Sequence, residues 1–199
     1  TMANTLLIAT HNALKTGEMR AILGSHFEEI TDLTSLPGMT PPEENGSTFA
    51  ENSAIKALAA SRAMPEAFIL ADDSGLEVDA LGGAPGIYSS RFAGENATDA
   101  TNREKLLAEL AKPEHANSPR TARFRCVVTI AKGGEVMARF DGTVEGRIAE
   151  TMTGEGGFGY DPLFIPEGYD QSFGELSEEI KNSMSHRSRA LEKFRNWLE

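Results

Sequence analysis

The chain has 199 residues, of which 40% are hydrophobic and 25% charged, and its formal net charge at pH 7 is −11. Its length fits a single domain, 1–199, with the composition of a soluble globular protein. The negative charge argues against a nucleic-acid partner, because such binding depends on neutralising phosphates with cations. No apolar run approaches the roughly 18 residues of a membrane helix. With no signal peptide pattern and a single cysteine, we expect a cytoplasmic protein without a membrane partner.

The first polar motif lies between a predicted strand and a predicted helix. Leu6–Ala9 is a short apolar run, and residues 16–23 have apolar side chains at helical spacing. The hexad Thr10–Lys15 joins them, at a helix start whose free N–H groups can bind an anion. Asn12 can cap the helix and Lys15 can reach a phosphate. The alternative is a plain capping turn with a solvated lysine.

A pair of glutamates, Glu43 and Glu44, precedes the next predicted helix. Ser47 or Thr48 together with Glu51 resembles a capping box, and the helix continues to Met64. Glutamates before a helix start interact favourably with the helix dipole, which is sufficient structural reason for the pair. Binding of a metal ion is the more specific alternative.

The central stretch contains two adjacent aspartates. Phe68–Ala71 predicts a buried strand, and Asp72-Asp73-Ser74-Gly75 follows it. Carboxylates at the C-terminal end of a buried strand lie where α/β sheets usually bind ligands. The alternative is a solvated turn, since Asp, Ser and Gly all favour turns.

The next part of the chain predicts a helix and an antiparallel segment. Thr98-Asp99 caps a helix over about 100–112. Arg120–Ala131 alternates apolar and polar residues as a strand does, and Val136–Phe140 and Gly142–Ile148 predict two more strands.

A glycine-rich loop, Gly154–Gly159, matches G-x-G-x-x-G literally. A dinucleotide-binding fingerprint requires a helix after the third glycine, whereas Tyr160-Asp161-Pro162 follows and proline opposes that helix. Phe158 or Tyr160 in such a loop could stack on a planar base. The alternative is that both rings belong to the core.

The last polar motif, Ser185-His186-Arg187, lies near the start of a C-terminal helix predicted over Ala190–Leu198. Cations at a helix N-terminus oppose the helix dipole, which indicates that they meet an anion or an acceptor. The alternative is a solvated charge cluster.

These motifs, in this order, resemble the inosine triphosphate pyrophosphatases, also called XTP/dITP pyrophosphatases. The matching segments are Ala-Thr-His-Asn-x-x-Lys at 9–15, Glu-Asn-Gly-Ser-Thr-Phe-x-Glu-Asn at 44–52, the block from Ala71 to Ser89, Gly-Gly-Phe-Gly-Tyr-Asp-Pro-Leu-Phe at 156–164, and Glu-Leu-Ser-x-Glu-x-Lys-Asn at 175–182 followed by Ser-His-Arg. The resemblance covers nearly the whole chain.

The resemblance implies an α/β fold: an elongated mixed β-sheet flanked by helices, with two lobes around a central nucleotide-binding cleft. It implies Mg²⁺ as cofactor and a homodimer, and it leaves open whether Mn²⁺ can replace Mg²⁺. It implies hydrolysis of ITP, dITP and XTP to the monophosphate and pyrophosphate, which removes deaminated purines from the nucleotide pool. Backbone amides near Phe158–Asp161 and His186-Arg187 are the expected donors to the 6-oxo group.

The resemblance also assigns roles to single residues. Asp73 matches the general base and one metal ligand, and Glu44 matches the other metal ligand. The positions that match substrate contacts are Thr10, His11, Asn12, Ala13, Leu14, Lys15, Lys56, Asp72, Ser74, Phe158, Gly159, Tyr160, Asp161, Lys181, His186 and Arg187.

Three other functions remain open at this level. A pyrophosphatase for other modified or pyrimidine nucleotides differs only in its substrates. A nucleotide-binding sensor would bind a triphosphate without turnover, and a phosphomonoesterase would release orthophosphate.

Overall fold

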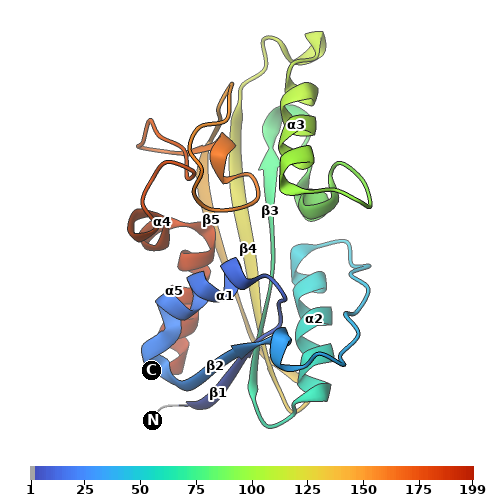
Figure 1. Cartoon of the computed structure of the whole chain (residues 1–199), viewed down its shortest axis with the longest axis vertical. Coiled ribbons are helices and arrows are strands. Elements are labelled where there is room, and N and C mark those ends of the chain that lie inside the picture. Colours follow the sequence, from blue (N-terminus) through green and yellow to red (C-terminus); the bar gives the residue numbers. More distant parts are fainter. Residues whose placement is uncertain (1–2) are drawn as a thin grey trace. The chain divides into compact units, whose positions relative to one another are not determined.

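A computed structural model describes residues 3–199 of the chain, so residues 1 and 2 of the predicted domain 1–199 lie outside the described range. The described residues form a mixed sheet with the strand order β2-β1-β3-β4-β5-β6 (Figure 1). The strands are β1 (Ala3–Ile8), β2 (Phe27–Asp32), β3 (Phe68–Val78), β4 (Thr121–Lys132), β5 (Glu135–Ile148) and β6 (Phe164–Pro166). β1 pairs in parallel with β2 and with β3, whereas β6 is antiparallel to β5.

The helices are α1 (Ala13–Leu23), α2 (Phe49–Ala63), α3 (Asp99–Leu110), α4 (Glu178–Met184) and α5 (His186–Leu198). Among the described residues, no helix has the length and apolar character needed to cross a bilayer. A mixed sheet flanked by helices was predicted, and that prediction is confirmed. The chain divides into two compact units, each with its own core. The first unit comprises residues 3–73, 126–142 and 187–199, and the second comprises 74–125 and 143–186.

In the first unit, helices cover both faces of the sheet. Leu6 and Ile8 of β1 pack with side chains of α1 and α5, whereas Leu7 packs with side chains of α2. Figure 1 shows α1 and α5 on one side of these strands and α2 on the other. Alternate residues of a strand point to opposite faces, so a strand covered on both faces is apolar at successive positions. This explains why the apolar run at Leu6–Ala9 does not alternate.

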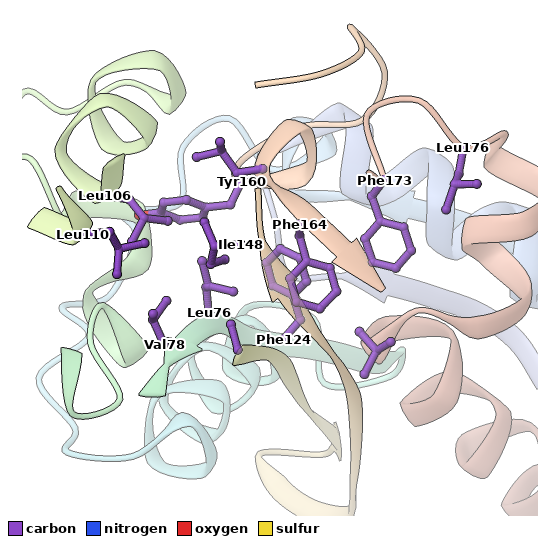
Figure 2. Packing of buried hydrophobic residues seen from close by; sticks show 13 residues of the cluster. Leu76, Val78, Leu106, Leu110, Phe124, Ile148, Tyr160, Phe164, Phe173 and Leu176 are labelled. Carbon is purple, nitrogen blue, oxygen red and sulfur yellow. The ribbon is translucent and has the colours of Figure 1, made fainter. Parts of the chain in front are cut away.

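In the second unit, aromatic rings form the centre of the core (Figure 2). The ring centroids of Phe124 and Phe164 are 4.5 Å apart, and those of Phe164 and Phe173 are 5.4 Å apart. Leu106 and Leu110 of α3 belong to the same cluster. The α3 helix is thus fixed to this core by its apolar face.

Two helix starts that the sequence indicated, those of α2 and α3, are confirmed by their caps. The Thr48 hydroxyl accepts a hydrogen bond from the Glu51 amide at 3.1 Å, and Glu51 in turn accepts from the Ser47 amide at 2.7 Å. Thr98 caps α3 and Ser177 caps α4 through the same kind of bond. Each cap satisfies an amide that the helix itself cannot satisfy.

Two predicted boundaries are wrong. Val136–Phe140 and Gly142–Ile148 were expected as separate strands, but β5 runs unbroken through Gly142. Gly142 is not among the glycines with positive φ, so it adopts extended backbone and makes no turn. The C-terminal helix also begins earlier than expected, at His186, and therefore contains His186 and Arg187 in its first turn.

Candidate functional site

The two central aspartates lie in the middle of a strand. β3 runs from Phe68 to Val78, so the turn expected at residues 72–75 is wrong. Adjacent side chains of a strand point to opposite faces, which places Asp72 on the face covered by α1 and α5 and Asp73 on the face covered by α2. Only 3% of Asp72 and 8% of Asp73 are exposed. Both carboxylates therefore depend on cations supplied by the covering helices.

Asp72 accepts hydrogen bonds from two cations. Lys15 Nζ donates to its carboxylate at 3.3 Å, and Arg187 donates through Nε and Nη2 at 3.4 Å each. Arg187 also donates to Glu18 Oε1 at 3.1 Å. Burial alone would lower the pKa of Arg187, but Asp72 and Glu18 raise that pKa above its usual value. The guanidinium thus stays charged although its side chain is only 3% exposed.

Asp73 faces a lysine and a glutamate on the other side of the sheet. Lys56 Nζ of α2 lies 3.9 Å from Asp73 Oδ1 and 3.3 Å from Glu44 Oε1. Burial raises the pKa of Asp73 to about 6; Glu44 and Asp72 add to the rise, while Lys56 and Lys15 oppose it. Burial lowers the pKa of Lys56, but the nearby carboxylates outweigh burial and raise that pKa above its ordinary value.

The second oxygen of Asp73 is the unsatisfied atom of this group. Asp73 Oδ2 is buried and has no hydrogen-bond partner among residues 3–199. A buried carboxylate oxygen without a donor or a cation is costly in free energy. The charged side chains around it are the carboxylates Glu18, Glu44 and Asp72 and the cations Lys15, Lys56 and Arg187.

Glu44 and Asp73 could therefore hold a divalent cation. Their two carboxylates already share one ammonium group, that of Lys56, and one of their oxygens lacks any partner in the described range. Nowhere among residues 3–199 do three or more His, Cys, Asp or Glu side chains form a metal-binding group. Two carboxylates suit Mg²⁺, which takes its remaining ligands from water and substrate phosphates.

A cavity of about 190 Å³ in the first unit includes part of this group. Thr10, His11, Glu44 and Lys56 supply its polar side chains. The rest of the wall consists of Ala9, Leu33, Met39, Pro41 and Pro42. The first polar motif and the glutamate of the second motif thus line one space.

The hexad Thr10–Lys15 both caps α1 and supplies a cation. Asn12 Oδ1 accepts from the Leu14 amide at 3.0 Å and from the Lys15 amide at 3.4 Å, as a helix cap does. The Thr10 hydroxyl accepts from the Asn12 amide at 3.0 Å. A solvated Lys15 was the alternative, and it is wrong, because the ammonium binds Asp72 and the side chain is only 21% exposed.

In the second unit, a buried ion pair orders the glycine-rich loop. Lys181 Nζ donates to Asp161 Oδ2 at 2.7 Å, and the two side chains are 4% and 5% exposed. The same Asp161 oxygen accepts from the Phe158 amide at 3.0 Å. The Lys181 ammonium also lies 4.7 Å from the centroid of the Phe158 ring. Charge, loop backbone and aromatic ring are therefore fixed together.

The two aromatic residues of this loop differ. Tyr160 is 5% exposed, belongs to the core, and donates through its hydroxyl to the Ser89 carbonyl at 2.6 Å. The Tyr160 ring is thus a core ring, and any contact with a ligand has to come from its backbone. Phe158 is only partly buried and lies outside the core cluster. Phe158 is the ring of this loop that could stack on a base.

His186 is also a structured residue. It is 4% exposed, and its ring stacks on Phe124 with centroids 4.7 Å apart and planes 16° from parallel. The alternative of a solvated cluster is therefore wrong for both His186 and Arg187. Ser74 follows Asp73 in β3 and is partly exposed.

Residues 6–197 match the sequence model of the Ham1 family. The chain belongs to the Ham1 family. The resemblance found in the motifs is thereby confirmed over nearly the whole chain.

Three relatives illustrate the family. A dITP/XTP pyrophosphatase of Desulforamulus reducens is 49% identical over 188 residues, which cover 94% of this chain and 92% of that protein. A dITP/XTP pyrophosphatase of Bacillus subtilis is 45% identical, with 97% and 96% covered. The solved structure of the Staphylococcus aureus Ham1 protein is 40% identical, with a TM-score of 0.84 over 98% of this chain and 97% of that one.

Some residues that organise the site in this Ham1-family chain were not predicted from the sequence. Glu18 holds Arg187, and Asp99 and Arg103 of α3 bind the backbone of the glycine-rich loop. Spacing offered a weak signal: Glu18 lies three residues after Lys15, and Asp99 and Arg103 lie four apart, so each pair shares a helix face. Nothing in the sequence says which distant residue such a face contacts.

Proposed function

We propose that this chain hydrolyses the deaminated purine nucleoside triphosphates ITP, dITP and XTP to the monophosphate and pyrophosphate, and so removes them from the nucleotide pool. The observation that carries the proposal is Asp73, a buried carboxylate with a pKa of about 6 and one unbonded oxygen, beside a lysine and a second carboxylate. The relatives named dITP/XTP pyrophosphatase, which match more than nine tenths of the chain, support it.

The phosphates are bound by the cations of the first unit. Lys15, Lys56 and Arg187 carry fixed positive charge, and Asp72 holds two of them in place. The Ala13 amide at the start of α1 adds a hydrogen-bond donor, and the helix adds the positive end of its dipole. Thr10 and His11 contribute from the wall of the cavity that also contains Lys56.

Glu44 and Asp73 hold Mg²⁺ in this proposal. The Asp73 oxygen that has no partner among residues 3–199, together with the neighbouring Glu44 carboxylate, supports a bound cation there. When bound, Mg²⁺ neutralises charge on phosphate oxygens. The Lys56 ammonium lies near both carboxylates and also lines the cavity, where it would contact the substrate.

Asp73 is the general base for the attacking water. The water oxygen attacks the α-phosphorus, the bond from that phosphorus to the oxygen bridging to the β-phosphorus breaks, and pyrophosphate leaves. The Asp73 carboxylate accepts the proton of the water through the oxygen that does not hold the cation. A base with a pKa of about 6 is ionised at neutral pH and binds a proton more strongly than an ordinary aspartate does.

The purine base is recognised by the glycine-rich loop. Phe158 stacks on the base, in the way aromatic side chains bind planar rings. Of the loop amides, those of Phe158, Gly159 and Asp161 already donate within the protein. The Tyr160 amide makes no hydrogen bond within residues 3–199, so it is the proposed donor to the 6-oxo group. The amino group of adenine would face this donor and leave both unpaired, which rejects ATP.

Product analysis tests the proposal. The purified chain is incubated with ITP or ATP in Mg²⁺, and pyrophosphate and orthophosphate are measured separately. We expect IMP and pyrophosphate from ITP, with ATP nearly untouched. Orthophosphate as the first product would point to a phosphomonoesterase, and tight ITP binding without turnover would point to a sensor. Either result refutes the proposal.

A substitution pair tests the role of Asp73. Asp73→Asn keeps the shape but removes the base, so we expect turnover of ITP to fall by at least about 10³-fold. Asp141→Asn is the matched control, because the Asp141 side chain is 77% exposed and should leave turnover unchanged. Near-normal turnover in Asp73→Asn would refute the base assignment.

The homodimer rests on the family resemblance and the cytoplasmic location on the sequence composition, and we carry both forward as proposals, together with the open question of whether Mn²⁺ replaces Mg²⁺. Sedimentation velocity measures the oligomeric state, and metal titration of ITP turnover compares Mn²⁺ with Mg²⁺.

A further inference from the structure

One residue of the glycine-rich loop is held by both of its backbone groups. The Gly159 amide donates to Asp99 Oδ2 at 2.9 Å, and the Gly159 carbonyl accepts from Arg103 Nη1 at 2.7 Å. Asp99 and Arg103 lie four residues apart on α3, so they project from the same face of the helix. Two charged side chains on one helix thus clamp one peptide unit on each side of a glycine.

The helix that carries this clamp is itself well anchored. Thr98 and Thr101 form a capping box at its start. Asn102, which lies between the two clamp residues, accepts from the Ala93 amide at 2.8 Å and donates to the Ser90 carbonyl at 3.0 Å. Leu106 is fully buried in the aromatic core. Because α3 is held in place, its side chains Asp99 and Arg103 also fix the position of the loop at Gly159.

Gly159 needs such external support. Its φ is +61°, and no heavy atom would lie within 4 Å of a Cβ added there. Glycine has the widest backbone freedom of any residue, and here no side chain packing restricts it. The neighbours of Gly159 are Phe158, the proposed stacking ring, and Tyr160, whose amide is the proposed donor to the base. A rotation of the backbone at Gly159 would move one of these groups relative to the other.

We propose that Asp99 and Arg103 are positioning residues for purine recognition: by clamping Gly159 they fix the Phe158 ring and the Tyr160 amide in one relative orientation. This inference rests on the proposed function for its ligand, a 6-oxo purine nucleotide. It assigns the selection between 6-oxo and 6-amino purines partly to two side chains that do not touch the substrate. It predicts that losing the clamp weakens base selection more than it weakens the chemical step.

The first test examines the clamp without any substrate. Amide hydrogen exchange of Phe158–Asp161 is measured in the whole chain, by NMR or mass spectrometry, for wild type and for Arg103→Met and Asp99→Ala. We expect exchange of the Gly159 amide to be faster by about tenfold or more in Asp99→Ala, which removes its acceptor, and to be faster also in Arg103→Met, which frees the Gly159 carbonyl. Lys105→Met is the matched control, since Lys105 also donates from α3 to a backbone carbonyl, that of Phe92 at 2.8 Å. Exchange that is unchanged in both clamp variants would overturn the clamp.

The second test measures selection. For ITP and ATP, kcat and KM are determined for the same variants. Losing either clamp side chain should raise the KM for ITP about tenfold, lower kcat by less than threefold, and reduce the ITP-to-ATP ratio of kcat/KM. Asp99→Asn keeps an acceptor and Arg103→Lys keeps a donor, so both should recover most of the ratio. A merely structural role would lower kcat for both nucleotides equally and leave their ratio unchanged, and that result would overturn the inference.

The outcome for the wild type separates this inference from the proposed function. A wild type that releases no pyrophosphate from ITP refutes the proposed function. The clamp is then judged on the ratio of Kd values for ITP and ATP, which must fall in Arg103→Met and remain unchanged in Lys105→Met. An unchanged Kd ratio would overturn the inference as well.

Discussion

The buried carboxylate of Asp73 should make the protein less stable at neutral pH than the variant Asp73→Asn. An aspartate in an unfolded chain has a pKa near 3.8, whereas that of Asp73 in the folded chain is about 6. The folded state therefore binds the proton more tightly. The stability that this group contributes is fully present below pH 3.8 and is lost as the pH rises through 6.

The size of the effect follows from the two pKa values. The gap between 3.8 and about 6, at about 1.4 kcal/mol per pH unit, amounts to about 3 kcal/mol at pH 7 and about 1.5 kcal/mol at pH 5. Asn resembles the protonated aspartate and carries no such cost. At pH 7 without divalent cations, Asp73→Asn should thus gain up to about 3 kcal/mol, or a melting temperature roughly 6–12 °C above wild type. The gain should shrink to about half at pH 5.

Urea unfolding at pH 5, 6 and 7 in EDTA measures this gain, with the exposed Asp141→Asn as control. The expected pattern is a difference that grows with pH for the Asp73 variant and is absent for the control. A gain that does not change with pH, or a loss of stability at pH 7, would refute the account of Asp73 as a carboxylate held at an energetic cost for function. Added Mg²⁺ should stabilise the wild type and have a smaller effect on the variant.

Three further predictions concern single contacts. Glu44→Gln should raise the Mg²⁺ concentration needed for half-maximal ITP turnover about tenfold or more. Glu43→Gln, at an exposed neighbouring position, should leave that concentration unchanged. An equal effect of both substitutions would refute the assignment of Glu44 as a metal ligand. Lys181→Met leaves the buried Asp161 charge uncompensated and should lower the free energy of unfolding by about 3 kcal/mol. The exposed Lys193→Met should lower it by less than about 1 kcal/mol. A loss under about 1 kcal/mol for both variants would contradict the importance of the buried ion pair for stability. Gly146→Ala would place its Cβ against the Ile165 carbonyl and the Phe164 ring and should lower the free energy of unfolding by about 2 kcal/mol. Gly17→Ala, in open space within α1, should instead raise it by up to about 1 kcal/mol. Urea unfolding measures both, and equal stability of the two variants would contradict the packing at Gly146.

Much of the local structure could be predicted from the sequence because its causes are local. The caps at Thr48 and Thr98 use hydrogen bonds within four residues, so the pattern of side chains is sufficient to locate them. The continuation of β3 through Asp72 and Asp73 could not be predicted in this way. Two adjacent aspartates favour a turn unless cations neutralise them, and the cations come from Lys15, Lys56 and Arg187, between 16 and 115 residues away.

The same distinction between local and distant causes applies to the candidate site. The sequence motifs singled out Lys15, Glu44 and Asp73 as binding residues, and the structure brings them into one unit. The motifs could not assign Tyr160 to the core or connect Arg103 with Gly159, because both facts depend on which element packs against the loop. Side-chain chemistry could thus be read from the sequence, whereas the partner of each side chain could not.

The position of the two aspartates within β3 restricts how this region of the chain can change in length. Because adjacent residues of a strand face opposite sides, inserting one residue between Phe68 and Asp72 would exchange the two carboxylates, so that each would meet the wrong helices. Insertions or deletions of one residue in this strand should therefore be far more damaging than most substitutions. Libraries that vary chain length are better directed to the surface connection at residues 113–119, where no strand register has to be kept.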